Sequence, residues 1–389
     1  MTPTEITFII MFSLPGYVAM LCGLYLVRMA YLKENPLGRR AFVMTIVLYF
    51  TSTLVWFSQI LYFVLPEMYV TLHSFIFLTF LLIYVFSYRF VFEITKAFPS
   101  ENFSFFHFLI PLLGFTVMLV WSFFVPREVQ LSLVRSGEAV AEGYSLFSLF
   151  FRSGIPILLS MNVIYSLLGL RRIARYRKVV VNYSADEFRG ALTWLYQYIF
   201  AMLAFFTGIS SIYIVSKITP VNAWFLFIPS LIAVIKYVIL LHNILLENFV
   251  IIRTDSDDSN RFASDSGSSP QDNESLQSIS GKSDSTIRHL ETYMQKKKPY
   301  LNPKYKITDM TRDLNTNRTT LSALINRTYG VNFSRFINRY RLLELRQIKS
   351  NSVNKNVSEE ELVHKAGFND YRGYLRVKFR EEIKQDAGA

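Results

Sequence analysis

The sequence predicts an all-α protein: a seven-helix transmembrane bundle followed by a soluble, all-helical domain with two helix-turn-helix units. Three observations predict this fold class. Seven long apolar runs fill the first 246 residues, a Ser- and Asp-rich stretch follows them, and the final basic segment has the periodicity of short amphipathic helices.

The overall composition points to lipid as the solvent for part of the chain. Of the 389 residues, 51% are hydrophobic, 16% are aromatic and only 18% are charged, which is more apolar than an ordinary soluble core requires. The single cysteine, Cys22, excludes an intramolecular disulfide framework and a zinc-finger protein. The net charge of +12 calls for an anionic partner, which is either lipid headgroups or nucleic acid.

Each apolar run is long enough for a membrane-spanning helix, which needs about 20 residues. We expect spans at residues 6–27, 41–65, 68–88, 103–125, 145–170, 191–215 and 222–246. The first run is expected to stay in the mature chain, because Glu5 replaces the basic start that a cleavable signal peptide needs.

Basic residues between the spans predict the orientation, since Lys and Arg in short loops favour the cytoplasmic side. On one side lie Arg28, Lys33, Arg39, Arg40, Arg89, Lys96, Arg171, Arg172, Arg175, Arg177, Lys178 and Arg189. The other side has only Arg127, Arg135 and Lys217. We therefore expect the N-terminus outside and the chain after the seventh span in the cytoplasm.

A domain boundary follows the last span. Residues 1–253 are expected to form the transmembrane domain, and residues 254–284 a disordered Ser/Asp-rich linker that cannot bury a core. A flexible coil of this length has a root-mean-square span of about 30 Å. Residues 285–389 contain 21 Lys and Arg against 11 Asp and Glu, so this last part carries most of the net positive charge.

The segment KITDMTRDLNTNRTTLSALINRTYG predicts the first helix pair of this basic part. Asn317 is a suitable N-cap for the second helix, and Gly330 suits a left-handed C-cap. Leu321, Leu324, Ile325 and Thr328 fall on one predicted buried stripe. A short helix, a turn and a second helix form the helix-turn-helix, whose second helix enters the major groove.

A second copy of this pattern follows a connecting helix at residues 334–348. The connecting helix places Phe336, Ile337, Tyr340, Leu342 and Leu343 on an apolar stripe, with Arg335, Arg339, Arg341 and Arg346 largely outside it. The second pair is predicted to begin at a Ser358 cap, to turn at Gly367 and to resume as a helix near Asp370.

Residues 285–386 resemble the DNA-binding domain of the AraC/XylS family of bacterial transcription regulators. The matching residues are Ile307, Met310, Leu314, Leu321, Leu324, Gly330 to Phe333, Arg341, Leu342, Leu345, Leu362, Ala366, Gly367, Phe368, Asn369, Tyr374 and Arg376. The resemblance covers about a quarter of the chain, and it implies sequence-specific binding to double-stranded DNA.

The resemblance also implies which residues contact DNA. By position, the base-reading residues are Thr319, Ser322 and Ala323 in the first unit, and Tyr371, Arg372, Gly373 and Arg376 in the second. Arg372 and Arg376 have the better chemistry, because an Arg fork bonds guanine O6 and N7 together. The candidates for phosphate contacts are Lys304, Lys306, Arg318, Arg327, Arg339 and Arg346.

In the transmembrane part, Lys236 is the one candidate for sensing. It falls near the middle of the seventh predicted span, where a charge needs a partner or a water-filled cavity, and a structural ion pair is an equal alternative. The sequence has no glycine-rich phosphate loop, HExxH pair or nucleophile elbow, so we expect neither an enzyme, nor a cofactor, nor a metal site.

These features together predict a one-component transcription regulator, a multi-pass protein of the bacterial cytoplasmic membrane with its DNA-binding domain in the cytoplasm. Its expected partners are double-stranded DNA, the lipid bilayer, an unknown small-molecule or membrane signal, and a second copy of the chain on paired half-sites. One alternative is a seven-helix receptor or transporter whose basic tail binds acidic lipid or a protein partner. Another keeps the DNA reading but releases the domain by proteolysis in the linker.

Overall fold

The computed structural model of the chain describes residues 3–32, 36–98, 100–136, 143–216, 227–252, 280–351, 354 and 357–386. In these segments the chain is helical, apart from connections and one isolated antiparallel bridge between Ser184 and Lys306. It divides into two units. The first unit consists of Met1–Thr95, Phe103–Ile173 and Thr193–Glu247, and the second of Lys96–Asn102, Ala174–Leu192 and Asn248–Ala389.

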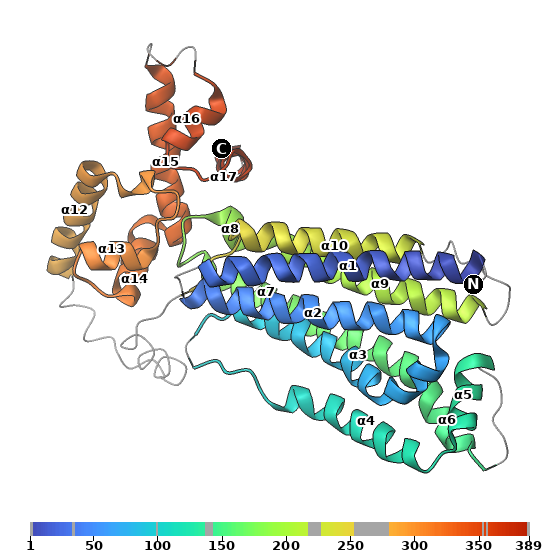
Figure 1. Cartoon of the computed structure of the whole chain (residues 1–389). Helices are drawn as coiled ribbons and strands as arrows, with labels where there is room; N and C mark the ends of the chain where they lie inside the picture. Colours follow the sequence, from blue (N-terminus) through green and yellow to red (C-terminus); the bar gives the residue numbers. More distant parts are fainter. Residues whose placement is uncertain are drawn as a thin grey trace. The chain divides into compact units, whose positions relative to one another are not determined.

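Seven helical segments of the described chain are long and apolar enough to cross a membrane, which confirms the predicted number. The helices are α1 (Pro3–Leu32), α2 (Pro36–Val64), α3 (Pro66–Ile94), α4 (Phe106–Phe123), α6 (Ser145–Arg152) with α7 (Gly154–Val180), α9 (Thr193–Ser216) and α10 (Phe227–Leu245). Figure 1 shows α1, α2, α3, α9 and α10 running alongside one another, and a further short helix, α5 (Arg127–Ser136), follows α4.

The fifth apolar segment begins at Ser145 as predicted, but it has an internal break and ends later than predicted. It is interrupted at Ser153, because Pro156 has no N–H to donate to the carbonyl of Arg152. The second part, α7, continues to Val180, so the basic residues expected in the following loop, from Arg171 to Lys178, are helical. Similarly, α3 extends past its predicted end at residue 88 to Ile94 and includes Arg89.

Aromatic and aliphatic side chains form the core of the first unit. One cluster joins α2, α3, α7 and α9 through Val55, Tyr84, Tyr165 and Met202. Hydrogen bonds fasten α2 to α10: the Tyr49 hydroxyl donates to the Tyr237 carbonyl at 2.7 Å, and Trp56 Nε1 donates to the Tyr237 hydroxyl at 2.9 Å.

The outer surface of the same unit is also apolar. The large exposed side chains of α4 include Leu109, Ile110, Leu113 and Phe123. An exposed apolar surface of this kind marks contact with a membrane or another protein rather than with water. This surface and the lengths of the helices are consistent with a multi-pass membrane protein.

The second unit contains the predicted DNA-binding segment and two earlier segments of the chain, Lys96–Asn102 and Ala174–Leu192. Its helices are α8 (Glu187–Ala191), α12 (Ser280–Lys297), the 3-10 helix η3 (Pro299–Leu301), α13 (Ile307–Asp313), α14 (Arg318–Tyr329), α15 (Phe333–Ser350), α16 (Glu359–Lys365) and α17 (Tyr371–Asp386). Residues 280–284 of the predicted linker belong to α12, and residues 254–279 lie outside the described segments.

Four predicted cap and turn residues of this unit, Asn317, Gly330, Ser358 and Gly367, are confirmed. The side chain of Asn317 accepts the Thr320 N–H at 2.7 Å, and that of Ser358 accepts the Glu361 N–H at 3.3 Å. Gly330 is left-handed, with φ +64°, at the end of α14. Gly367 has φ +91° in the turn between α16 and α17.

Three predictions about the buried faces are wrong. Thr328 is exposed on α14, and Leu343 is 54% exposed on α15. Arg341, expected largely outside the apolar stripe, is the largest fully buried side chain of the described chain, at 1% exposure. Its burial follows from backbone carbonyls supplied by distant segments, which no helical periodicity reveals.

Candidate nucleic-acid interface

The first helix pair consists of α13 and α14, joined by residues 314–317. The side chains of Ile307 and Met310 in α13 and of Leu321 and Ile325 in α14 are buried and hold the pair together. On the remaining surface of α14, Thr319 and Ala323 are exposed and Ser322 is half-buried. The three predicted base-reading residues therefore lie at or near the surface of one helix, and they carry no charge.

The second pair consists of α16 and α17, joined by residues 366–370. Arg372 and Arg376 are exposed on α17 and are four residues apart, so they share one face of the helix. Gly373 is half-buried, and its N–H donates to Oδ1 of Asp370 at 2.7 Å, which caps the helix. This face of α17 therefore carries two exposed arginine side chains.

Tyr371, which is predicted to read a base, is hydrogen-bonded to α16. Its hydroxyl donates to Oε2 of Glu359 at 2.8 Å, and the hydroxyl of Tyr374 donates to Oε1 at 3.3 Å. The ammonium of Lys349 also bonds this carboxylate. Hydrogen bonds from Lys349 and Tyr371 lower the pKa of Glu359, and the bond to Glu359 raises the pKa of Tyr371. The carboxylate therefore stays ionised and orients Tyr371 toward α16.

Helix α15 separates the two pairs. It has 18 residues, so at a rise of 1.5 Å per residue it is about 27 Å long. Successive major-groove sites on one face of B-DNA are about 34 Å apart. The connecting helix is thus close to the length that two helices need to reach neighbouring turns of a duplex.

The predicted phosphate contacts fall into two groups. Lys304, Arg327, Arg339 and Arg346 are exposed, although Nε of Arg339 is also 3.4 Å from a carboxylate oxygen of Glu381. Arg318 is only 8% exposed, and its guanidinium lies 5.3 Å from the ring centre of Tyr183. Lys306 is half-buried with its ammonium 5.8 Å from the same ring. The burial of Arg318 argues against its use as a phosphate contact.

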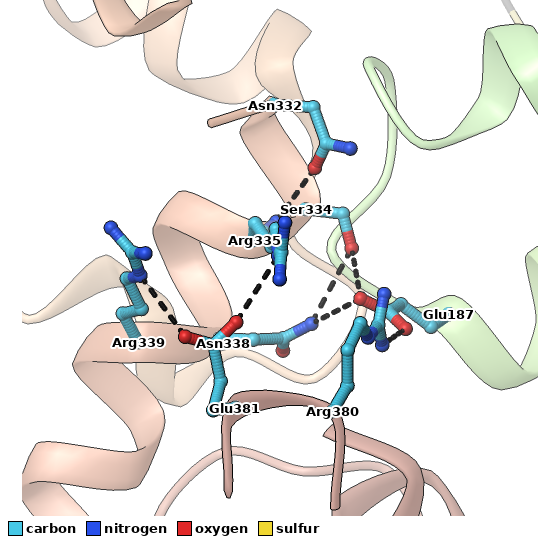
Figure 2. Close-up of polar contacts among 8 residues, drawn as sticks. All are labelled: Glu187, Asn332, Ser334, Arg335, Asn338, Arg339, Arg380 and Glu381. Carbon is cyan, nitrogen blue, oxygen red and sulfur yellow. Dashed lines mark hydrogen bonds and ion pairs between the residues drawn. The ribbon is translucent and has the colours of Figure 1, made fainter. Parts of the chain in front are cut away.

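Sequence reasoning missed the contribution of the loop that follows α7. Figure 2 shows Glu187 of α8 facing Ser334 and Asn338 of α15 and Arg380 of α17. Oε1 of Glu187 accepts from Ser334 Oγ at 3.1 Å and from Asn338 Nδ2 at 3.2 Å, and Oε2 pairs with the Arg380 guanidinium. No sequence signal marks Glu187, because its partners lie about 150 residues or more further along the chain.

Arg335 and Glu381 form a second link between α15 and α17. Nε of Arg335 is 3.1 Å from Oε1 of Glu381, and both side chains are largely shielded from solvent. Figure 2 shows that Glu381 also receives Arg339, so one carboxylate of α17 holds two guanidinium groups of α15. The two helices are therefore joined by ion pairs near the end of α17 and at the first turns of α15.

Arg341 gathers three segments of the second unit around one guanidinium. Its nitrogens donate to the carbonyls of Tyr300 at 2.8 Å, Asn302 at 2.8 Å and Ala185 at 3.2 Å, and to Oδ1 of Asn338 at 3.1 Å. Burial lowers the pKa of Arg341 to about 10, and the charges of Asp186 and Glu187 oppose this shift. The group therefore remains protonated at neutral pH and acts as a structural cation.

In the first unit, Lys236 is 5% exposed on α10. Its ammonium lies 4.7 Å from the ring centre of Tyr237 and 5.6 Å from that of Phe205. Aromatic faces stabilise a cation through their quadrupole. The structure thus places Lys236 beside two aromatic rings, and its predicted role in sensing stays a prediction.

In comparisons with known proteins, no family model, no curated protein and no solved structure matches this chain.

Proposed function

We propose that this chain is a membrane-embedded one-component transcription regulator whose α12–α17 segment is an AraC-type domain that binds DNA by sequence. The observation that carries the proposal is the exposed pair Arg372 and Arg376 on the second helix of a short helix pair, within a strongly basic segment. An Arg fork is the commonest side chain for reading guanine in the major groove.

In this proposal α17 supplies most of the discrimination between bases. Thr319, Ser322 and Ala323 of α14 offer hydroxyl and methyl contacts, which discriminate weakly. Arg327, Arg346 and Lys304 bind phosphates, which sets the affinity and its dependence on salt. The turn between α16 and α17 begins with Ala366, Gly367, Phe368 and Asn369. These four residues carry most of the resemblance to the family.

The seven apolar helices provide anchorage and the input in this proposal. A ligand or membrane state regulates DNA binding only if it favours one of two arrangements of the helices. Lys236 is the proposed intramembrane sensing residue. Anchoring also raises the local concentration for a second contact, so two chains on paired half-sites bind more tightly than one.

The experiment uses the full-length chain in nanodiscs of neutral lipid, so that DNA and lipid do not compete. A randomised duplex library is selected by the wild-type protein, and binding to the enriched sequence is measured against salt concentration. We expect sequence preference and a steep fall of affinity with salt. Arg372→Lys keeps the charge and loses the fork, so it should lose about 1–3 kcal/mol of discrimination at one base pair.

Two further variants separate base reading from electrostatics. Arg346→Ala should weaken binding to all sequences alike and reduce the salt slope by about one. Lys365→Ala removes an exposed charge of α16 that pairs with Glu361, and it should leave the sequence preference unchanged. Binding to anionic vesicles without any preference among duplexes would show instead that the basic segment is a lipid-binding tail.

A further inference from the structure

The loop between α7 and α9 is hydrogen-bonded through its backbone to the C-terminal part of the second unit. The N–H of Ala185 donates to the carbonyl of Tyr305 at 3.2 Å, and the N–H of Ile307 donates to the carbonyl of Tyr183 at 3.0 Å. This forms the antiparallel bridge between Ser184 and Lys306. We call residues 181–191 the strap.

The strap also caps α15. The first N–H groups of a helix have no partner within the helix. Here the N–H of Ser334 donates to the carbonyl of Val181 at 3.0 Å, while the side chain of Asn332 accepts the N–H of Arg335 at 2.9 Å. One of the free donors of α15 is thus satisfied by a residue that precedes it by some 150 positions.

Glu187 then connects α15 to α17. Its carboxylate accepts from Ser334 and Asn338 with one oxygen and pairs with Arg380 through the other (Figure 2). The Glu187 side chain is 14% exposed, so these bonds are shielded from water. Charge-assisted hydrogen bonds in such a setting are about twice as strong as neutral ones.

The strap contacts the first helix pair as well. Tyr183 is buried, and its ring faces the guanidinium of Arg318, which is the first residue of α14. The carbonyl of Ala185 accepts from Arg341 in α15. The strap therefore bonds to α15 and α17 and packs against α14, which are the helices that set the geometry of the proposed DNA interface.

The chain continues from the strap into two of the apolar helices without a flexible spacer. α7 ends at Val180, immediately before the strap, and α9 begins at Thr193, after Leu192. Leu192 has φ +49°, and a Cβ at Gly190 would lie 3.1 Å from Cγ1 of Val180, so the strap leaves through a tight turn. The strap is thus joined covalently to α7 directly and to α9 through Leu192.

We infer that the strap is the docking element of the C-terminal helices and the route by which α7 and α9 set the position of α17. Glu187 is the strap residue whose side chain bonds to both α15 and α17. The docking stands on the contacts above, whereas its effect on DNA affinity rests on the proposed function. Because a preorganised interface binds with less loss of conformational entropy, the docked arrangement is the one that binds DNA tightly.

The test measures backbone hydrogen exchange in the full-length chain in nanodiscs. We expect Glu187→Ala to speed exchange in residues 331–338 and 371–382 by about tenfold, since a hydrogen bond to a charged group is lost. Glu187→Gln keeps an acceptor for Ser334 and Asn338, so its effect should fall mainly on α17. Arg380→Gln should speed the exchange of α17 as Glu187→Gln does. The double variant Glu187→Ala with Arg380→Gln should exchange no faster in α17 than Glu187→Ala alone.

The matched control is Glu361→Ala, which removes an exposed acidic partner of Lys365 on α16. This variant should leave the exchange of residues 331–338 unchanged. Unaltered exchange of both segments in Glu187→Ala would overturn the docking, whatever the outcome with DNA.

The same nanodiscs are then used with the duplex selected by the wild-type protein. We expect Glu187→Ala to bind it about tenfold more weakly while Glu361→Ala binds normally. Equal or tighter binding by Glu187→Ala, with faster exchange, would overturn the positioning role of the strap. If neither the wild type nor any variant binds duplex DNA, the proposed function fails, and the exchange data still decide the docking.

Discussion

At the scale of single residues, Arg341 is the side chain that links several segments of the second unit by hydrogen bonds. Its guanidinium donates to the carbonyls of Tyr300, Asn302 and Ala185, and the bonds to Tyr300 and Ala185 are buried. A buried polar group without a partner costs about 1–3 kcal/mol. Arg341 is therefore a structural residue, although two other arginines of the same helix, Arg339 and Arg346, are exposed.

We predict that Arg341→Ala destabilises the second unit by about 3 kcal/mol or more, because several acceptors lose their donor together. Pulse proteolysis of the full-length chain in increasing urea measures this change. Arg346→Ala removes an exposed arginine from the same helix and should shift stability by less than about 0.5 kcal/mol. Equal effects of the two variants would contradict the structural role of Arg341.

The ammonium of Lys236 lies near two aromatic rings, those of Phe205 and Tyr237. We predict that Lys236→Met leaves the amount of membrane-inserted protein unchanged but abolishes the response of DNA occupancy to changing growth conditions. Genome-wide mapping of the DNA bound by each variant measures this response. Lys236→Arg, which keeps the cation, is the control. Full regulation by the Met variant would remove Lys236 from sensing.

The residue types at helix ends were predictable, but the partners of Arg341 and Glu187 were not. Asn317, Ser358 and Gly330 act within four residues of their own position, so the local sequence contains the whole interaction. Glu187 bonds to residues of α15 and α17 that lie about 150 to 190 positions away. Only the folded chain reveals such a contact.

At the scale of elements, the turn between α16 and α17 has the strictest requirement. Gly367 has φ +91°, and a Cβ there would lie 2.3 Å from the carbonyl oxygen of Tyr300. Gly330 also has positive φ, at +64°, but no atom lies within 4 Å of the Cβ position. The two glycines thus share a backbone conformation and differ in their surroundings.

We predict that Gly367→Asn destabilises the second unit by more than about 2 kcal/mol, because the backbone of Tyr300 and Leu301 must move. Gly330→Asn should cost less than about 1 kcal/mol, since Asn tolerates the left-handed region. Urea-dependent proteolysis compares the two variants in the full-length chain. A similar loss for both would mean that the contact with Tyr300 is not limiting.

The sequence predicted well which apolar helices exist, but it did not predict where several helices begin or end. Seven apolar runs gave seven helical segments, because hydrophobic length is a property of the run itself. The start of α12 at Ser280 and the helical course of α7 to Val180 were missed. Ser- and Asp-rich composition and clustered Arg residues favour a loop on average, and tertiary contacts overrule that preference here.

At the scale of the whole molecule, the division of the chain is discontinuous. The predicted boundary at residue 253 assigns residues 174–192 to the transmembrane domain, whereas the structure groups them with the C-terminal helices. The predicted orientation of the spans places both the strap and these helices in the cytoplasm. The two features are mutually consistent, because a loop packed in the second unit has to be on the same side of the membrane as its partners.

We predict that this side is the cytoplasmic one. With Cys22→Ser as the background, Ser350→Cys at the end of α15 and Ser132→Cys on α5 provide single labelling sites, both exposed in the wild type. A membrane-impermeant maleimide should label Ser132→Cys in intact cells and Ser350→Cys only after permeabilisation. Labelling of Ser350→Cys in intact cells would rule out contact with the chromosome.

The strap has a consequence for how the protein is made. During synthesis Glu187 leaves the ribosome well before Ser334, Asn338 and Arg380 are translated. Until then its carboxylate and the carbonyl of Val181 are hydrogen-bonded to water. Contacts between residues so distant in sequence form slowly, since a long loop must close first. The last stretch translated therefore completes a fold begun near mid-chain, and a premature stop codon before Arg380 leaves that earlier segment without its final partner.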